Sequence, residues 1–249
     1  MFMLYRKTEL ENAPERTTWQ SKAFTSFSEM MLSRESPYPC VPGIQGFKAD
    51  MLRFAFLSDP SGSAAPETLG QILKQYGTIS RETGDYASLV VLCEPCLHSY
   101  QIKDYESLFW NLLNECHAAD EREWPEHIPL DPSDPAWEFC YDGEPYFAFC
   151  ATPAHERRKS RHFPYLLLAF QPRFVFEKIN ASTPLGRKLQ NVIRKRLSIY
   201  DDLPIHPSLK WYGEENNHEW KQYFLAEENT SPSKCPFMAM KQKWNSLRS

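Results

Sequence analysis

Apolar residues recur at helical spacing in four stretches of the chain, and each stretch predicts an amphipathic helix. The clearest helix covers about residues 104–116, where one stripe carries Tyr105, Leu108, Phe109, Leu112, Leu113 and Cys116. The same period predicts helices over 22–33, 66–80 and 184–200. In the last of these, Thr183 is the expected N-cap, and the residues expected to face inward are Leu185, Leu189, Val192, Ile193 and Leu197.

Short apolar runs between these helices predict strands. Residues 51–57, 88–93 and 165–171 are runs of this kind, and 174–179 is read as an extension of the last one. The aromatic-rich segment 137–152 predicts a hairpin around Asp142-Gly143, a dipeptide suited to a type I′ turn.

The remaining segments are expected to be irregular or only briefly helical. Residues 37–46 contain three prolines and two glycines, so a loop is predicted there, and a second loop is predicted over 123–135. A short last helix should begin near Asn217, with Trp220 and Phe224 facing inward.

The order of these elements lacks strict alternation of strand and helix, and the hairpin must be antiparallel. We therefore predict an α+β fold with one largely antiparallel sheet covered by helices. Residues 19–249 should form a single domain, preceded by a polar, loosely packed segment over 1–18.

Composition narrows the class of protein. The chain has 249 residues, of which 42% are hydrophobic, so it can bury a full core without disulfide bonds. The net charge of −4 gives it no overall attraction to nucleic acid or anionic lipid. Neither a signal peptide nor a long apolar run is present, and the seven cysteines are an odd, scattered set. A cytoplasmic protein with reduced thiols is expected, without membrane or nucleic-acid partners.

The segment 152–161, TPAHERRKSR, is the most informative candidate for chemistry. It places His155, three arginines and a lysine between two predicted strands. Guanidinium groups bind carboxylates and phosphates through paired hydrogen bonds, and an imidazole can bind a metal ion. A solvated basic loop has the same composition, so the pattern alone leaves both readings open.

Three other clusters give weaker signals. Cys93-Glu-Pro-Cys96 resembles a dithiol motif, but no helix begins directly at its first thiol, and a zinc site lacks two further ligands. The predicted helix 184–200 is basic on its outer face, which is typical of a nucleic-acid contact and also of any solvated helix. The aromatic and polar residues of 206–225 are typical of a pocket wall and equally of a core edge.

Three long segments resemble the YqcI/YcgG family: 37–56 (PYPCVPGIQGFKADMLRFAF), 137–177 (including YDGEPYFAFCATPAHERRKSRHFPYLLLAFQPRF) and 193–237 (IRKRLSIYD, then HPSLKWYGEENNHEWKQYFLAEEN and CPF). The resemblance extends over nearly the whole chain from about residue 20. It implies a heme-dependent N-oxygenase, a monooxygenase that hydroxylates a guanidine or amine nitrogen such as that of L-arginine. Heme b would be the cofactor, O2 the co-substrate and an unidentified reductase the electron donor.

The resemblance also implies roles for particular residues. His155 is the first choice for the axial ligand of the heme iron, with Cys40 and His218 as rivals. Arg157, Arg158 and Arg161 would then pair with heme propionates or with a substrate carboxylate.

A cationic substrate needs an acidic partner, and Glu219 or Glu144 could supply it. Two other classes of protein stay open: a heme-binding or small-ligand sensor without turnover, and a protein that binds nucleic acid through its basic helix. The aromatic C-terminal segment could also supply the interface of a homodimer.

Overall fold

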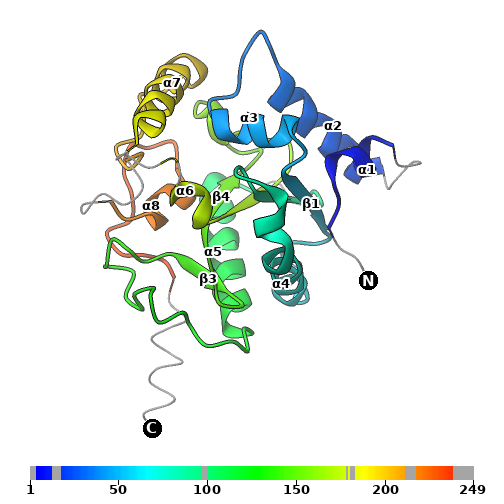
Figure 1. Ribbon diagram of the computed structural model, residues 1–249, viewed down its shortest axis with the longest axis vertical. Coiled ribbons are helices and arrows are strands. Elements are labelled where there is room, and N and C mark those ends of the chain that lie inside the picture. Colours follow the sequence, from blue (N-terminus) through cyan, green and yellow to red (C-terminus); the bar gives the residue numbers. More distant parts are fainter. Residues whose placement is uncertain are drawn as a thin grey trace.

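The computed structural model describes residues 4–12, 18–96, 100–177, 179, 183–210 and 217–237, and its centre is one five-stranded sheet (Figure 1). The strands follow the order β1-β2-β5-β4-β3. Their bounds are β1 Leu52–Leu57, β2 Ser88–Cys93, β3 Phe139–Tyr141, β4 Glu144–Ala151 and β5 Leu167–Pro172. Only the β1–β2 pair is parallel, and the other three pairs are antiparallel. The predicted α+β class with a largely antiparallel sheet is confirmed.

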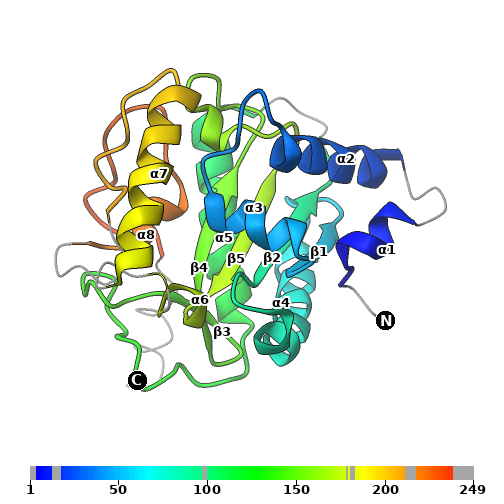
Figure 2. The ribbon, with the colours of Figure 1, turned by 45° about the horizontal axis from the view of Figure 1, so that its top comes forward.

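Helices cover both faces of the sheet. One face carries α2 (Thr18–Leu32), α3 (Val41–Lys48) and α7 (Pro184–Tyr200), while α4 (Ala65–Thr83) and α5 (Ile102–Ala118) lie on the other (Figure 2). The described residues also contain a 3₁₀ turn and three short helices, namely η1 Lys159–Arg161, α1 Lys7–Glu11, α6 Phe174–Glu177 and α8 Trp220–Tyr223. The molecule is therefore a three-layer arrangement with the sheet in the middle.

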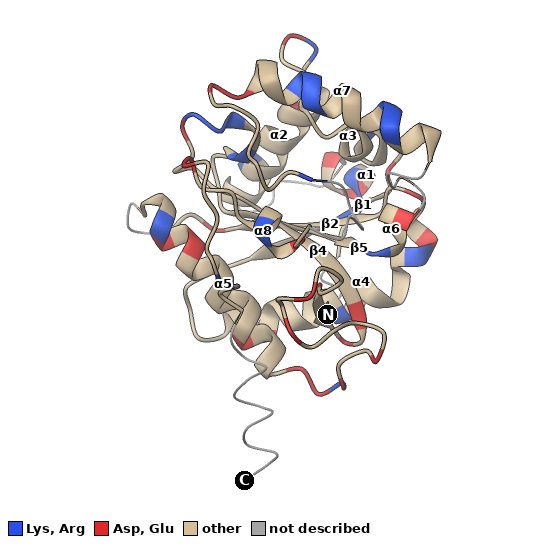
Figure 3. Ribbon diagram, turned by 90° about the vertical axis from the view of Figure 1, so that its left-hand side faces the viewer, with Lys and Arg blue, Asp and Glu red and all other residues tan. Residues whose placement is uncertain are grey.

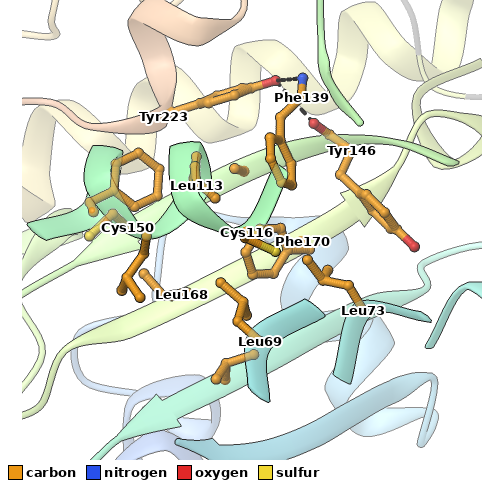
Figure 4. Packing of buried hydrophobic residues seen from close by; sticks show 14 of the residues in the cluster. Leu69, Leu73, Leu113, Cys116, Phe139, Tyr146, Cys150, Leu168, Phe170 and Tyr223 are labelled. Carbon is orange, nitrogen blue, oxygen red and sulfur yellow. Dashed lines mark hydrogen bonds between the residues drawn. The ribbon is translucent and has the colours of Figure 1, made fainter. Parts of the chain in front are cut away.

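Two hydrophobic clusters hold these layers together, one on each side of the sheet. The larger packs α4, α5 and α8 against the sheet, with Leu69, Leu113 and Phe170 fully buried among its members (Figure 4). The smaller packs α2 and α3 against the opposite face through Phe27, Phe47 and similar side chains. Because neighbouring residues of a strand point to opposite faces, the continuous apolar runs in β2 and β5 follow from burial on both sides.

The hairpin and the cap of α7 form as the sequence predicts. Asp142 and Gly143 have φ values of 48° and 77°, and two positive φ angles in the connecting pair are what a type I′ turn requires. Thr183 accepts a hydrogen bond from the Gly186 N–H at 2.9 Å and so caps α7.

The predicted loop over 37–46 is wrong in its second half, where α3 begins. Pro42 lies in the first turn of this helix, where its missing N–H has no partner to lose. Cys40 is the N-cap, and its Sγ accepts a hydrogen bond from the Gly43 N–H at 3.4 Å. Proline at this position therefore starts a helix, and the thiol of Cys40 is fixed at its beginning.

Two other expectations about local structure are wrong. Residues 174–177 form the helix α6 and do not continue the preceding strand. Residues 4–12 of the polar N-terminal segment are not loosely packed, because Tyr5 exchanges two backbone hydrogen bonds of 2.8 Å with Phe54 and Leu4 is buried.

The inward face predicted for α7 is only partly correct. Leu197 is buried and Leu189 and Ile193 are half-buried, but Leu185 and Val192 are 51% and 38% exposed. The helix lies on the surface of the sheet layer, so its buried stripe is narrower than the apolar pattern suggests.

No helix within the described ranges combines the length and the apolar character that crossing a membrane requires.

We expect Gly46→Ala to destabilise the protein by about 1–3 kcal/mol, because α3 packs closely against its neighbours at this position. A Cβ on Gly46 would lie 2.7 Å from the backbone oxygen of Tyr86 and 2.7 Å from a methyl carbon of Leu52. Urea unfolding measures the effect, and Gln45→Ala on the exposed side of the same helix is the control. Equal stability of the two variants would contradict this account of the packing.

Candidate functional site

A mainly apolar cavity of about 320 Å³ lies between the sheet and the layer formed by α2, α3 and α7. Its walls include Phe27 of α2, Val90, Phe149 and Ala169 of the sheet, and Ile193 of α7. The volume is within the range of small-molecule sites. Polar groups are few, so each one on the wall can orient a ligand.

Cys40 places a thiol on the wall of this cavity. The residue is exposed, and it stays in reach of solvent at the N-terminus of α3. Desolvation by the surrounding protein raises the pKa of the Cys40 thiol, and the Gly43 N–H and the Arg161 charge offset only part of this effect. The thiol is therefore neutral by itself, and binding to a metal ion would release its proton.

His162 places an imidazole on the same wall. Its Nδ1 lies 2.6 Å from the backbone oxygen of His155, and a carbonyl oxygen can only accept. Nδ1 must therefore carry the proton, which leaves the lone pair of the neutral ring on Nε2. No hydrogen-bond partner of this Nε2 lies in the part of the chain that the structure describes.

Glu219 brings a carboxylate to the cavity from the segment before α8. The residue is only 4% exposed, and Asn217 and Gln222 donate side-chain hydrogen bonds to its two oxygens. Gln222 also donates to the Asn217 side chain at 3.0 Å and itself lines the cavity. These amides fix the carboxylate in a position where it can receive a cationic group.

The basic segment 152–161 is tied to the C-terminal segment and does not line the cavity. Arg161 is buried, and its guanidinium donates to the backbone oxygens of Cys150, Gln222 and Tyr223. The guanidinium carbon of Arg161 lies 4.1 Å from the centre of the Phe149 ring. Burial lowers the pKa of Arg161 to about 10. The charge is retained at neutral pH and holds three chain segments together.

Arg158 is bound to the chain through its side chain, and Arg157 through its backbone N–H. The Arg158 side chain is buried and donates to the backbone of Ala226 and to Asn229. One Glu227 oxygen accepts from the backbone N–H groups of residues 156–158. The Arg157 side chain is exposed. The predicted contacts of these arginines with propionates stay a prediction.

His155 is fully buried and does not line the cavity, and both of its ring nitrogens take part in hydrogen bonds. Nε2 donates to the backbone oxygen of Leu225 at 2.8 Å, so Nδ1 is the acceptor of the Thr152 hydroxyl at 2.9 Å. An iron ligand needs a free lone pair. A ligand role for His155 would therefore require one of these bonds to break.

The other predicted site residues lie elsewhere. His218 is half-buried beside Trp220 and does not line the cavity. Glu144 pairs with Arg81 at 3.2 Å on the hairpin. Cys93 is buried at the end of β2, and Cys96 beyond it is half-buried. Within the described ranges, no cluster of three or more metal-binding side chains is present. Trp211 and Tyr212 of the expected pocket wall lie outside the described residues.

Sequence reasoning missed His162 and underrated Gln222. His162 directly follows the basic segment, and no pattern in the surrounding residues shows that it differs in role from His155. The position of His162 relative to the sheet could have identified it. Thr152 and His162 form a β-bridge, so the chain returns to the sheet at His162.

We expect the stability of the protein to fall as the pH decreases from 6.5 to about 4, by about 3 kcal/mol through His155 alone. Burial lowers the pKa of His155 from 6.5 to about 4. Its contribution is fully present above pH 6.5 and is lost as the unfolded chain binds a proton that the folded chain rejects. Urea unfolding at several pH values should give a flatter profile for His155→Gln. The control His127→Gln, in an exposed loop, should keep the wild-type slope, and equal slopes in all three proteins would contradict this role.

The chain is similar to known proteins over most of its length. The model of the YqcI/YcgG family matches residues 27–238. Two Bacillus subtilis (strain 168) proteins are similar over almost their whole length: YqcI at 50% identity, covering 100% of both chains, and YcgG at 49%, covering 98% of both. A Streptomyces lavendulae protein named "Putative N(omega)-hydroxy-L-arginine synthase DcsA" is 32% identical, over 88% of this chain and 84% of its own. No solved structure matches the chain. The chain therefore belongs to the YqcI/YcgG family.

Proposed function

We propose that the protein is a heme-dependent N-oxygenase that hydroxylates a guanidino or amino nitrogen of a small molecule in the cavity beneath α7. One observation carries the proposal: a thiol residue, a histidine and a buried carboxylate from three distant segments all line one apolar cavity. These residues are Cys40, His162 and Glu219. The name of the Streptomyces relative, which refers to an N-hydroxylated arginine, agrees with this chemistry.

The residues on the wall fit a heme group. A porphyrin needs apolar surfaces, an axial ligand and cations for its propionates. The cavity has mostly aliphatic and aromatic walls, with the Cys40 thiol exposed to it and two cations, Arg194 and Lys210, on its lining. When bound, heme would supply the activation of O2 and the transfer of one oxygen atom to nitrogen.

Cys40 is the axial ligand that the geometry favours. Its Sγ is on the wall, and the Gly43 N–H that points at it would stabilise a thiolate. His162 is the second candidate, since its Nε2 is available on the same wall. His155 and His218, which the resemblance also suggested, do not line the cavity.

Glu219 is the group proposed to bind the substrate cation. A carboxylate on the lining of an apolar cavity is the type of group that binds a guanidinium or ammonium group of a ligand. Asn217 and Gln222 hold the carboxylate and are proposed as positioning residues. The apolar walls would exclude water from the reacting nitrogen.

Cys40→Ser should abolish the absorption spectrum of a thiolate-bound heme, because a serine hydroxyl is a poor iron ligand while it still caps α3. The measurement is the Soret band of protein reconstituted with heme b, before and after reduction and exposure to CO. Cys96→Ser, which changes a thiol away from the cavity, should keep the wild-type spectrum.

A wild-type protein that takes up no heme would overturn the proposed function. An unchanged spectrum in Cys40→Ser would instead reject this ligand and point to His162. Heme uptake without consumption of O2 in the presence of amines or guanidines would favour the sensor alternative.

Glu219→Gln should raise the KM for L-arginine by roughly 10- to 100-fold, because a hydrogen bond to a charged group contributes about 1.5–3 kcal/mol. Mass spectrometry of the N-hydroxylated product measures turnover across substrate concentrations. Glu144→Gln on the hairpin, outside the cavity, is the matched control and should behave as wild type. An unchanged KM in Glu219→Gln would remove Glu219 from the substrate site.

A further inference from the structure

The outer face of α7 carries an apolar stripe exposed to solvent. Leu185, Val192 and Ile199 are 51%, 38% and 77% exposed, and they follow one another at intervals of seven residues. Seven residues are almost two turns of an α-helix, so the three side chains lie along one line. In the part of the chain that the structure describes, the only other large apolar residues with such exposure are Leu32 and Leu130, which are not on this helix.

Helix α7 is also strongly basic. It contains no acidic residue, whereas the whole chain has a net charge of −4 (Figure 3). Its cations are Arg187, Lys188, Arg194, Lys195 and Arg196. Arg194 lines the cavity and Arg196 donates to the backbone oxygen of Tyr38, so the cations considered beside the stripe are Lys188 and Lys195. Lys188 and Lys195 are exposed, and each lies three residues after a member of the stripe. Within the described ranges neither lysine takes part in an ion pair. An apolar line flanked by unneutralised cations fits a partner with an apolar patch surrounded by acidic groups.

Helix α7 lies between the cavity and the solvent, and this position indicates which kind of partner could bind there. Leu189, Ile193 and Leu197 on the inner side of this helix line the cavity. A protein bound on the outer side would therefore be separated from the cavity by a single helix, about 10–12 Å thick.

We propose that the outer face of α7 is the docking surface for an acidic one-electron carrier protein that reduces the cofactor in the cavity. The redox role rests on the proposed function. Each N-hydroxylation replaces an N–H bond with N–O–H by using one oxygen atom of O2. The other atom leaves as water, which consumes two electrons and two protons. The carrier supplies these electrons one at a time, and the solvent supplies the protons.

Other occupants fit this face less well. Interfacial membrane helices anchor through aromatic as well as aliphatic side chains, and the exposed stripe is purely aliphatic. Nucleic acid would use the cations and gain nothing from the stripe.

The test uses the double variant Lys188→Glu/Lys195→Glu and the matched control Lys48→Glu/Lys74→Glu, which changes the net charge equally on α3 and α4. Two acidic carriers, a bacterial ferredoxin and a flavodoxin, are the probes. Calorimetry should show that wild type and control bind at least one carrier, and that affinity falls with added salt. The α7 variant should bind at least about tenfold more weakly. Ile199→Ser should weaken binding without changing its dependence on salt.

Stopped-flow reduction of the heme-loaded protein provides the second measurement. Reduction by the carrier should slow in the α7 variant, while reduction by dithionite should be unchanged in all proteins. The docking surface is rejected if the α7 variant binds the carriers as tightly as the control does. It is also rejected if the wild type binds neither carrier, whether or not it binds anionic vesicles or duplex DNA.

The two proposals fail in different ways. Carrier binding that depends on α7 in a protein that takes up no heme would support the docking surface and reject the N-oxygenase. Turnover driven by dithionite, together with carrier binding that the α7 variant leaves unchanged, would support the N-oxygenase and reject the docking surface.

Discussion

Arg161 carries a positive charge into the interior, and two other chain segments are arranged to satisfy it. Its guanidinium donates to backbone oxygens of β4 and of residues 222 and 223, and it stacks on Phe149. A buried charge without partners costs several kcal/mol, so these carbonyls cannot move away independently. His155 and Arg158 add bonds to residues 225–229 of the same segment. The basic loop thus acts as a clamp on the C-terminal segment.

The candidate site depends on this clamp. Glu219 and Gln222 belong to the clamped segment and face the cavity, while Phe149, which contacts Arg161, forms part of its wall. On the opposite side, α3 fixes Cys40 through its cap, and the close contact of Gly46 with Tyr86 holds α3 against the sheet. Cys40, Glu219 and Gln222 are therefore positioned by well-packed segments. A site that orients a small ligand needs such rigid positioning.

Helix α7 presents different groups on its inner and outer sides. Its inner residues complete the cavity, and its outer residues present apolar and basic groups to solvent. The predicted inward stripe of five residues included Leu185 and Val192, which in fact face outward. A helix that covers a sheet buries a limited arc, so apolar residues beyond that arc need another explanation. A docked partner is the one that we propose.

The sequence by itself determined the main helices and strands, the hairpin turn and the class of sheet, because apolar periodicity, the Asp142-Gly143 pair and the Thr183 cap act over a few residues. It did not predict α3 and α6, which lie where a loop and a strand were expected. It also marked the loop 152–161 as exceptional. Only the tertiary structure decided what that loop does: Arg161 and Arg158 bind carbonyls that are 62 and 68 residues away in the chain, and no local pattern encodes such a partner. The same holds for His155 and His162. The two rings differ in which atoms surround them after folding, and burial and hydrogen bonding, rather than residue type, leave His162 and Cys40 on the cavity wall.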